Sequence, residues 1–344
     1  MLHRLSPQTI RILALLVVLL LVILFFSTQV PNYLSGRLFN RVSSSVAIMA
    51  LIATAQTLVI LTRNIDLSIG SVVGFVAFAT GSLITDNPDL HWTLLVAFSI
   101  TLGMFFGMIN GFFVAVAKVP AIIVTLGTLA LFRSVLVEFS DAKSIVTANL
   151  PTWLINFPNT PLLEIGTLQL RASFAVAVAV VLVVHIALSR IRIARKLYAV
   201  GSNPEAAEMA GINIGLTVFT AFVLSGALAG LAGFLFLARF GTITVVAGLG
   251  FELKSVAAAV VGGVNIFGGS GLVIGALIGA ILVDLIDSSL VRWHLVSEFW
   301  REAVLGGLIL LAVTMDTLVM RSLAVWRTAR SNSKEDRRAN VQSP

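Results

Sequence analysis

Residues 189–213 read SRIRIARKLYAVGSNPEAAEMAGIN, and this polar stretch lies between two long apolar runs. Its second part carries the signals of a short helix near residues 204–210. A helix kept in a basic loop between two apolar runs indicates a surface shown to a partner. Ser202 or Asn203 can cap its N-terminus, and Pro204 suits the first helical position. Glu205 places a negative charge in the first turn, and Gly211 can adopt the left-handed conformation that ends the helix.

The composition is that of a membrane protein. Of 344 residues, 58% are hydrophobic and 11% are charged, and the mean hydropathy is +1.02. Repeated apolar runs approach the ~20 residues that cross a bilayer as a helix, and no alternating barrel pattern is seen. We therefore expect an all-α polytopic membrane protein with about ten transmembrane helices. The expected spans are about 10–28, 43–62, 67–85, 92–116, 120–137, 172–188, 214–238, 251–267, 270–287 and 302–320.

The basic residues predict the orientation of these spans. Loops on the side of the two termini hold fourteen Lys and Arg and the opposite loops hold seven, while Arg133 and Lys254 fall within spans. The excess predicts cytoplasmic N- and C-termini and a cytoplasmic loop at 189–213. The net charge of +7 thus follows from membrane orientation, and we expect no nucleic-acid partner.

A single transmembrane domain is expected over residues 1–320. The basic start precedes an apolar run without a small-residue cleavage site, which favours a retained first span over a signal peptide. The external loop 138–171 is either a cap over the outer mouth or a connector, and we favour the connector. Residues 321–344 are expected to form a charged cytoplasmic tail.

Several kinds of chemistry are excluded by the residues present. The chain has no cysteine, so it has no disulfide or thiolate metal site. Its four histidines lack the spacing of metal ligands, and no phosphate-binding Gly-x-x-x-x-Gly-Lys-Ser/Thr motif occurs. We therefore expect no enzyme activity, metal or cofactor in this chain, which cannot hydrolyse ATP by itself.

Polar side chains at membrane depth are costly and mark candidate sites. The densest cluster, TRNIDLSIGS at 62–71, fits two interpretations equally. It is either a short cytoplasmic turn or a break near 63–71 whose helix N-terminus at Ser68 faces a polar pocket near the midplane. A glycine-rich region at 262–271 likewise predicts a broken helix or a tight turn. Asp284 and Asp287 are three residues apart and share one helix face.

The motif EAAxxxG at 205–211 resembles the EAA signature of ABC importer permeases. Further segments resemble the monosaccharide permeases of the ribose, xylose, galactose, rhamnose and autoinducer-2 type. The likeness runs from about residue 45 to 316. The segments that carry it are NIDLSIGS (64–71), Asn110-Gly111, PAIIVTLGT (120–128) and AAAVVGG (257–263).

This resemblance implies a multi-pass permease subunit of the bacterial inner membrane, within an ATP-driven ABC importer. The cargo would be a monosaccharide or sugar-like molecule, and the resemblance favours rhamnose, autoinducer-2 or ribose. The permease would move it by alternating access. The implied partners are a cytoplasmic ABC ATPase that carries the ATP and Mg, a periplasmic sugar-binding protein and a second permease subunit, identical or related. Membrane lipid would anchor the basic run 190–196.

The same resemblance implies roles for individual residues. Pro204, Glu205, Ala206, Ala207 and Gly211 would belong to the ATPase-coupling helix, with the two small alanines letting it lie in a groove of the ATPase.

A sugar path needs amides, hydroxyls or carboxylates that bind weakly enough to release. We assign it to Asn64, Asp66, Ser68, Asn110, Thr125 and Asn265. The alternative function is an ion-coupled secondary transporter with Asp66, Asp284 or Asp287 as the coupled carboxylate. That alternative leaves the capped helix at 204–210 unexplained.

Overall fold

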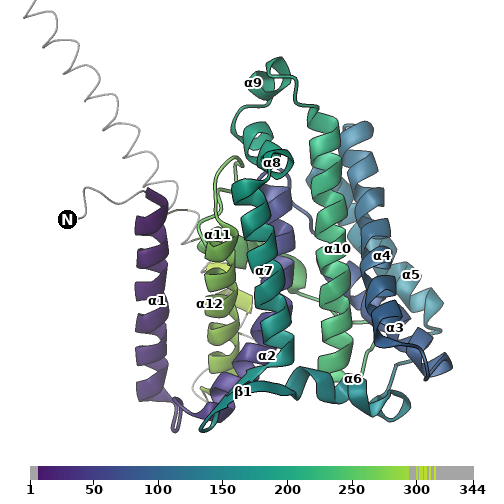
Figure 1. Ribbon diagram of the computed structural model, residues 1–344, viewed down its shortest axis with the longest axis vertical. Coiled ribbons are helices and arrows are strands. Elements are labelled where there is room, and N and C mark those ends of the chain that lie inside the picture. The colour runs from purple at the N-terminus through teal and green to yellow at the C-terminus, as the bar shows by residue number, and fades with distance from the viewer. Residues whose placement is uncertain are drawn as a thin grey trace, which may run out of the picture.

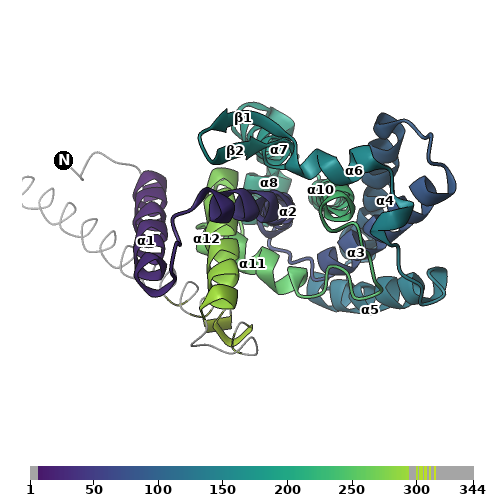
Figure 2. The ribbon, with the colours of Figure 1, turned by 90° about the horizontal axis from the view of Figure 1, so that it is seen from below.

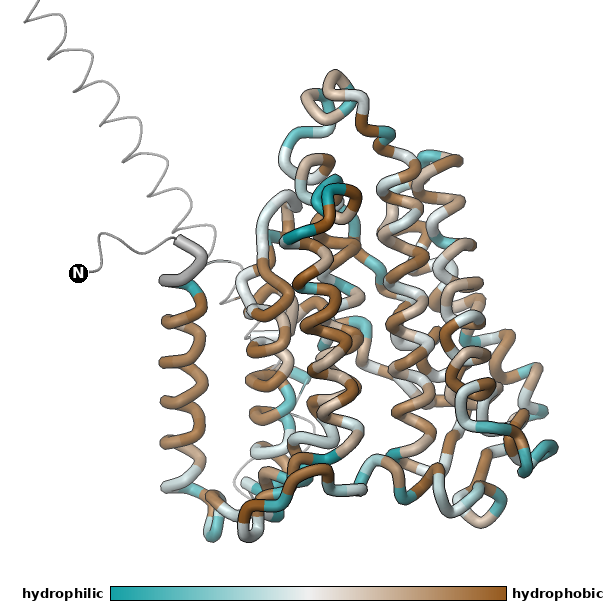
Figure 3. The backbone as a smooth tube through the Cα atoms, viewed as in Figure 1, coloured by the Kyte–Doolittle hydropathy of each residue, from teal (hydrophilic) through white to brown (hydrophobic). Residues whose placement is uncertain are grey.

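The computed structural model describes residues 7–293 and isolated positions between 300 and 314. Its helices form one bundle whose two ends differ (Figure 1). The short helix α9 (Pro204–Met209) marks one end, and a hairpin of β1 (Pro161–Ile165) and β2 (Leu168–Arg171) marks the other. We call these the α9 end and the hairpin end. Figure 3 shows hydrophobic residues along the helices between the two ends.

Within the described residues, eight helices are long and apolar enough to cross a membrane. They confirm eight of the ten expected spans and an all-α polytopic membrane protein. The eight are α1 (Pro7–Gln29), α2 (Gly36–Ile60), α3 (Ile69–Asp86), α4 (Trp92–Gly111) with its π-helical extension Phe112–Val116, α5 (Ala121–Phe139), α7 (Ala172–Arg190), α10 (Ile214–Phe240) and α12 (Val273–Arg292).

The other two expected spans have different outcomes. The span expected at 251–267 is only the eleven-residue helix α11 (Phe251–Val261). At 1.5 Å per residue it covers about 16 Å, half of a ~30 Å hydrocarbon core. The span expected at 302–320 lies largely outside the described residues, and the tail at 321–344 lies wholly outside them.

Helix α10 lies at the centre of the bundle, beside α2, α3 and α4 (Figure 2). Its close approach to α4 depends on glycine. A Cβ on Gly230 would collide with the backbone of Ser99, and one on Gly226 would come within 2.9 Å of the Cα of Gly107. Small residues let helices approach this closely in lipid, so these glycines determine how closely α4 and α10 pack.

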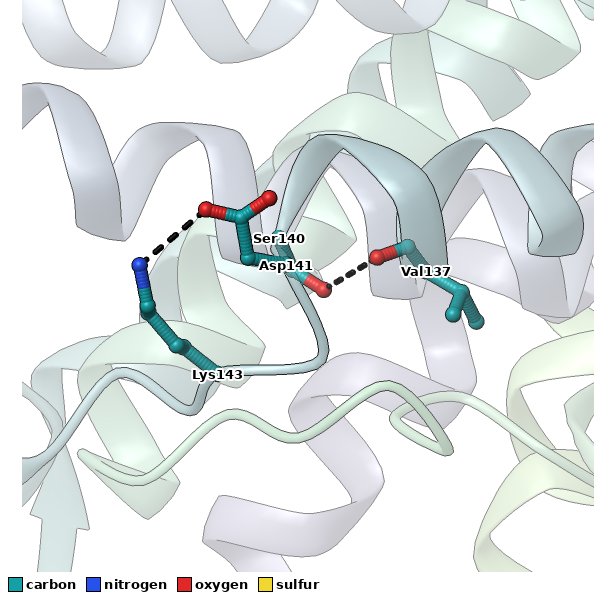
Figure 4. Close-up of polar contacts among 4 residues, drawn as sticks. All are labelled: Val137, Ser140, Asp141 and Lys143. Carbon is teal, nitrogen blue, oxygen red and sulfur yellow. Dashed lines mark hydrogen bonds and ion pairs between the residues drawn. The ribbon is translucent and has the colours of Figure 1, made fainter.

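A tight turn ends α5 at the hairpin end (Figure 4). The Ser140 hydroxyl donates to the carbonyl of Val137 at 3.0 Å, and Asp141 and Ala142 both have positive φ. Lys143 pairs with Asp141 at 3.0 Å, but both side chains are exposed, so this ion pair adds little stability. The turn directs the chain to Ile145, which pairs with Ile243 beyond α10.

The rest of the 138–171 loop is more ordered than the connector that the sequence favoured. It contains α6 (Thr152–Asn156), two 3₁₀ turns (Thr147–Asn149 and Phe157–Asn159) and the β1–β2 hairpin. Asn40 of α2 holds the hairpin, because its amide donates to the carbonyl of Thr167 at 3.2 Å and its oxygen accepts from the backbone N–H of Gln169 at 3.0 Å.

Residues 241–250 run from the end of α10 to the start of α11 without helical structure beyond single turns. Gly248 contacts the backbone of Gly70 at the start of α3, where a Cβ would collide. Arg133 of α5 holds the segment by donating from Nη1 to the carbonyls of Val245, at 2.8 Å, and Ala247, at 2.6 Å. Residues 241–250 and α11 together form one crossing of the bundle, which we call the traverse. Its first half is non-helical and its second half is helical.

The glycine-rich region 262–271 is a turn between α11 and α12 at the α9 end. The backbone N–H of Gly269 donates to the carbonyl of Leu61, just after α2, at 3.0 Å. Of the two interpretations open for this region, the structure has the tight turn.

Candidate functional site

Helix α9 forms as its sequence signals predict. The Asn203 side chain accepts from the backbone N–H of Ala206 at 3.1 Å, which makes Asn203 the N-cap, and Pro204 takes the first position. Gly211 has φ +77°, and its N–H donates to the carbonyl of Glu208 at 2.8 Å. In Figure 1, α9 is the outermost element of its end.

The two faces of α9 have different environments. Ala207 is 4% exposed and packs with Val59, Val200 and Phe222 of the chain's own bundle. The resemblance had implied that Ala207 lies against a groove of the ATPase. In the structure Ala207 instead packs inward against the bundle. Glu205 and Ala206 are exposed, and Met209 is 84% exposed. An apolar side chain held this far out suits contact with another protein.

A second helix in the same loop, α8 (Arg192–Ser202), was not predicted. Leu197 and Gly201 are buried, while Ala194 and Tyr198 are partly buried. Their spacing is that of one helix face, a signal that the basic residues of the run obscured. Arg192, Arg195 and Lys196 lie on the exposed side.

Arg63 joins α8 and α9 to the turn after α2. Its Nε donates to the carbonyl of Gly201 at 2.6 Å, and its Nη2 donates to the carbonyl of Ser202 at 2.8 Å. These carbonyls directly precede the α9 cap. Arg63 has φ +66°, a conformation that costs a non-glycine residue about 1–2 kcal/mol. The α2–α3 turn is thus fixed to the base of α9.

Beyond Arg63, the chain descends into the bundle and four expected site residues meet. The Asp66 carboxylate accepts from the backbone N–H of Ser68 at 2.9 Å and from its hydroxyl at 2.7 Å. The Asn110 amide donates to the Ser68 hydroxyl at 2.7 Å and accepts from Thr128 at 2.7 Å. Thr125 donates to the carbonyl of Ile65 at 3.3 Å.

We call Asp66, Ser68, Asn110, Thr125 and Thr128 the α3–α5 polar network. None of its members is more than 6% exposed. Both interpretations of the 63–71 region are therefore partly right. It begins as a turn against α8 at the α9 end, and it continues as non-helical backbone that starts α3 inside the bundle.

The other two expected path residues lie apart from this network. The Asn64 amide donates to the carbonyl of Thr62 at 2.9 Å, and Asn64 lines a cleft of about 620 Å³ below α9, together with Glu208 and Asn213. Asn265 accepts from the backbone N–H of Phe267 at 3.0 Å and so stabilises the turn between α11 and α12.

A separate cavity of about 410 Å³ lies towards the hairpin end, and we call it the hairpin-end cavity. It is lined by α2, the last turns of α10, the 242–251 segment, α11 and α12. Lys254 pairs with Asp287 across it at 3.0 Å, with both side chains mostly buried. Asp284 and Arg239 line the same space.

Sequence reasoning missed this constellation. It found Asp284 and Asp287 on one helix face but no basic partner for them, because Arg239 lay just beyond the span expected at 214–238 and Lys254 lay on a different expected span, 251–267. The structure puts Arg239 in the last turn of α10 and Lys254 on the inner side of α11. Only the fold brings residues 30 to 50 positions apart into one cavity.

Comparisons with known proteins agree with this architecture. The family model described as "Branched-chain amino acid transport system / permease component" matches residues 38–313. No solved structure matches the chain.

Curated relatives match over most of their length. The autoinducer 2 import system permease protein LsrC of Escherichia coli O157:H7 is 38% identical over 307 residues, covering 88% of this chain and 85% of the relative. The protein of the same name from Enterobacter sp. (strain 638) is 36% identical over 283 residues, covering 82% and 79%. With eight apolar helices among its described residues, this multi-pass protein of the bacterial inner membrane belongs to the family of transport-system permease components.

Proposed function

We propose that this chain is the permease subunit of an ATP-driven ABC importer that moves a small sugar-like molecule from the periplasm into the cytoplasm. The observation that carries the proposal is α9, a capped helix that holds Glu205 and Met209 outward while Ala207 ties it to the bundle. On this proposal the α9 end is cytoplasmic and meets a separate ATPase chain, which holds the ATP and Mg.

The cargo is proposed from the relatives and from the polar groups inside the bundle. The relatives are named for import of autoinducer 2, and the resemblance in the sequence favoured autoinducer-2, rhamnose or ribose. We propose a ligand of this class, delivered by a periplasmic binding protein to a pair of permease subunits.

Coupling would run from α9 to the α3–α5 polar network. Closure of the ATPase pair on ATP would displace α9, and the hydrogen bonds from Arg63 to Gly201 and Ser202 would transmit the movement to the α2–α3 turn. Because Asp66 and Ser68 lie on that turn, separation of α3 from α4 and α5 would expose the network to a passing ligand.

The test uses Met209→Asp, because this side chain is 84% exposed. In proteoliposomes that contain the permease, its ATPase and its binding protein, we expect loss of ATPase association and of ATP-driven uptake of labelled autoinducer 2, D-ribose or L-rhamnose. Leu162→Asp is the matched control, because Leu162 is 61% exposed on the hairpin at the other end. It should retain both.

The alternative, an ion-coupled secondary transporter, gives a different result. Wild-type protein alone would then accumulate the ligand under a proton or sodium gradient without ATP, and Met209→Asp would transport normally. Either result would overturn the ABC assignment.

A further inference from the structure

The hairpin-end cavity brings together four charged side chains of balanced sign. Arg239 and Lys254 contribute two positive charges, and Asp284 and Asp287 contribute two negative charges. Lys254 and Asp287 form an ion pair there. Ionisable groups at this depth in a membrane bundle are costly and mark functional sites. The four lining charges sum to zero, although Arg41 and Arg171 also lie close enough to act on Arg239.

The two remaining charged groups are incompletely hydrogen-bonded. Asp284 is 7% exposed, and its Oδ2 atom has no hydrogen-bond partner in the described part of the chain. The Nη1 atom of Arg239 is likewise buried without a partner among the described residues. Buried polar atoms are nearly always satisfied in native proteins. An open acceptor and an open donor in one cavity call for a molecule that offers both, as a hydroxyl does.

The remaining lining fits the same class of molecule. Thr242 and Thr244 add hydroxyls from the non-helical segment, and Phe240 and Phe251 add aromatic surface for the C–H faces of a sugar. The volume of about 410 Å³ falls within the usual range of small-molecule sites, about 300–1,000 Å³. The cavity lies at the end opposite α9, where a ligand would enter the permease.

We propose that the hairpin-end cavity is a binding site for a neutral polyhydroxylated ligand, held by Asp284 and Arg239, on its way into the permease. This site rests on the proposed function for its place in the import route. It is distinct from the α3–α5 polar network, which is closed and internally hydrogen-bonded.

The experiment measures binding to the purified permease in nanodiscs, without ATPase or binding protein. Radiolabelled autoinducer 2, D-ribose and L-rhamnose are the probes, and D-ribose 5-phosphate is the charged comparison. We expect at least one neutral probe to bind and to do so more tightly than the phosphate. Asp284→Asn and Arg239→Gln should each weaken it by roughly 10–100-fold, the loss expected for a hydrogen bond to a charged group. Asp141→Asn, an exposed site at the same end, should bind as wild type.

Thr244→Val gives a milder second test, because it removes one hydroxyl without changing charge and is expected to fold. Failure of all neutral probes to bind wild type, tighter binding of the phosphate, or unchanged affinity in every folded cavity variant would each overturn the site. Met209→Asp should keep the binding while losing ATP-driven uptake, so failure of this site and failure of the ABC assignment give different results.

Discussion

Replacing Arg63 with glycine should disconnect ATP hydrolysis from transport while leaving the protein folded. The substitution removes the guanidinium that holds the carbonyls of Gly201 and Ser202. Glycine adopts the left-handed conformation that Arg63 has, φ +66°, without a steric cost. The backbone of the α2–α3 turn can therefore stay where it is.

The magnitude follows from the two bonds and the backbone. Hydrogen bonds from a charged group contribute about 1.5–3 kcal/mol when buried, but here one bond is exposed to solvent, so we take about 2 kcal/mol for the pair. Relief of the left-handed strain returns about 1 kcal/mol. We expect stability to fall by about 1 kcal/mol. The link itself weakens by about 2 kcal/mol, which corresponds to roughly 30-fold.

The assay is uptake per ATP hydrolysed, in proteoliposomes that contain the full transporter. Arg63→Gly should hydrolyse ATP while its ATP-driven uptake falls by up to about 30-fold. Lys118→Gly is the matched control, because Lys118 is a basic residue at the same end with φ +58° and its ammonium makes no hydrogen bond or ion pair within the described residues. Wild-type uptake in Arg63→Gly, or an equal loss in the control, would refute a mechanical role for Arg63.

Three further variants test other contacts. Gly201→Ala should destabilise the protein by about 1–3 kcal/mol, because its Cβ would collide with the backbone of Leu61 and Gly269. Gly127→Ala is the control, because a Cβ there would meet nothing within 4 Å. Thermal unfolding of the two variants in detergent checks this, and equal melting temperatures would contradict it. Asn110→Ala should cost about 1–3 kcal/mol, since it leaves Ser68 and Thr128 short of a partner, and normal uptake in both Asn110→Ala and Asp66→Ala would remove these residues from the path. Burial raises the pKa of Tyr198 above its ordinary value of about 10. The contribution of Tyr198 to stability should therefore be constant below that pH and fall above it, because the unfolded state ionises first. Tyr198→Phe should reduce this fall when unfolding is measured at a series of alkaline pH values.

Much of the architecture could be predicted because lipid imposes simple demands on a sequence. Eight spans were found with edges within seven residues of the helices, since each needs an apolar run of membrane length. Helix α9 was predicted to the residue at Pro204, because Asn203, Pro204 and Gly211 act locally. The sequence also singled out Asp66, Ser68, Asn110 and Thr125, which the fold brings into one network.

Apart from α8, the failures involve contacts between distant segments. The span expected at 251–267 is shorter than expected, and nothing local reveals that Arg133 would hold Val245 and Ala247 of the preceding loop against the bundle. The hairpin at 161–171 depends on Asn40, more than a hundred residues away. The pairing of Lys254 with Asp287 was missed for the same reason.

The non-helical half of the traverse also constrains where the molecule can face lipid. Backbone N–H and C=O groups outside helices cannot be exposed to hydrocarbon, since nothing there satisfies them. Residues 241–250 nevertheless present Val246 and Leu249 outward, 61% and 68% exposed, with Leu253 of α11 at 53% beside them. We therefore expect this flank, which also borders the hairpin-end cavity, to be covered by protein, and in a pair of permease subunits it would be turned towards the other copy.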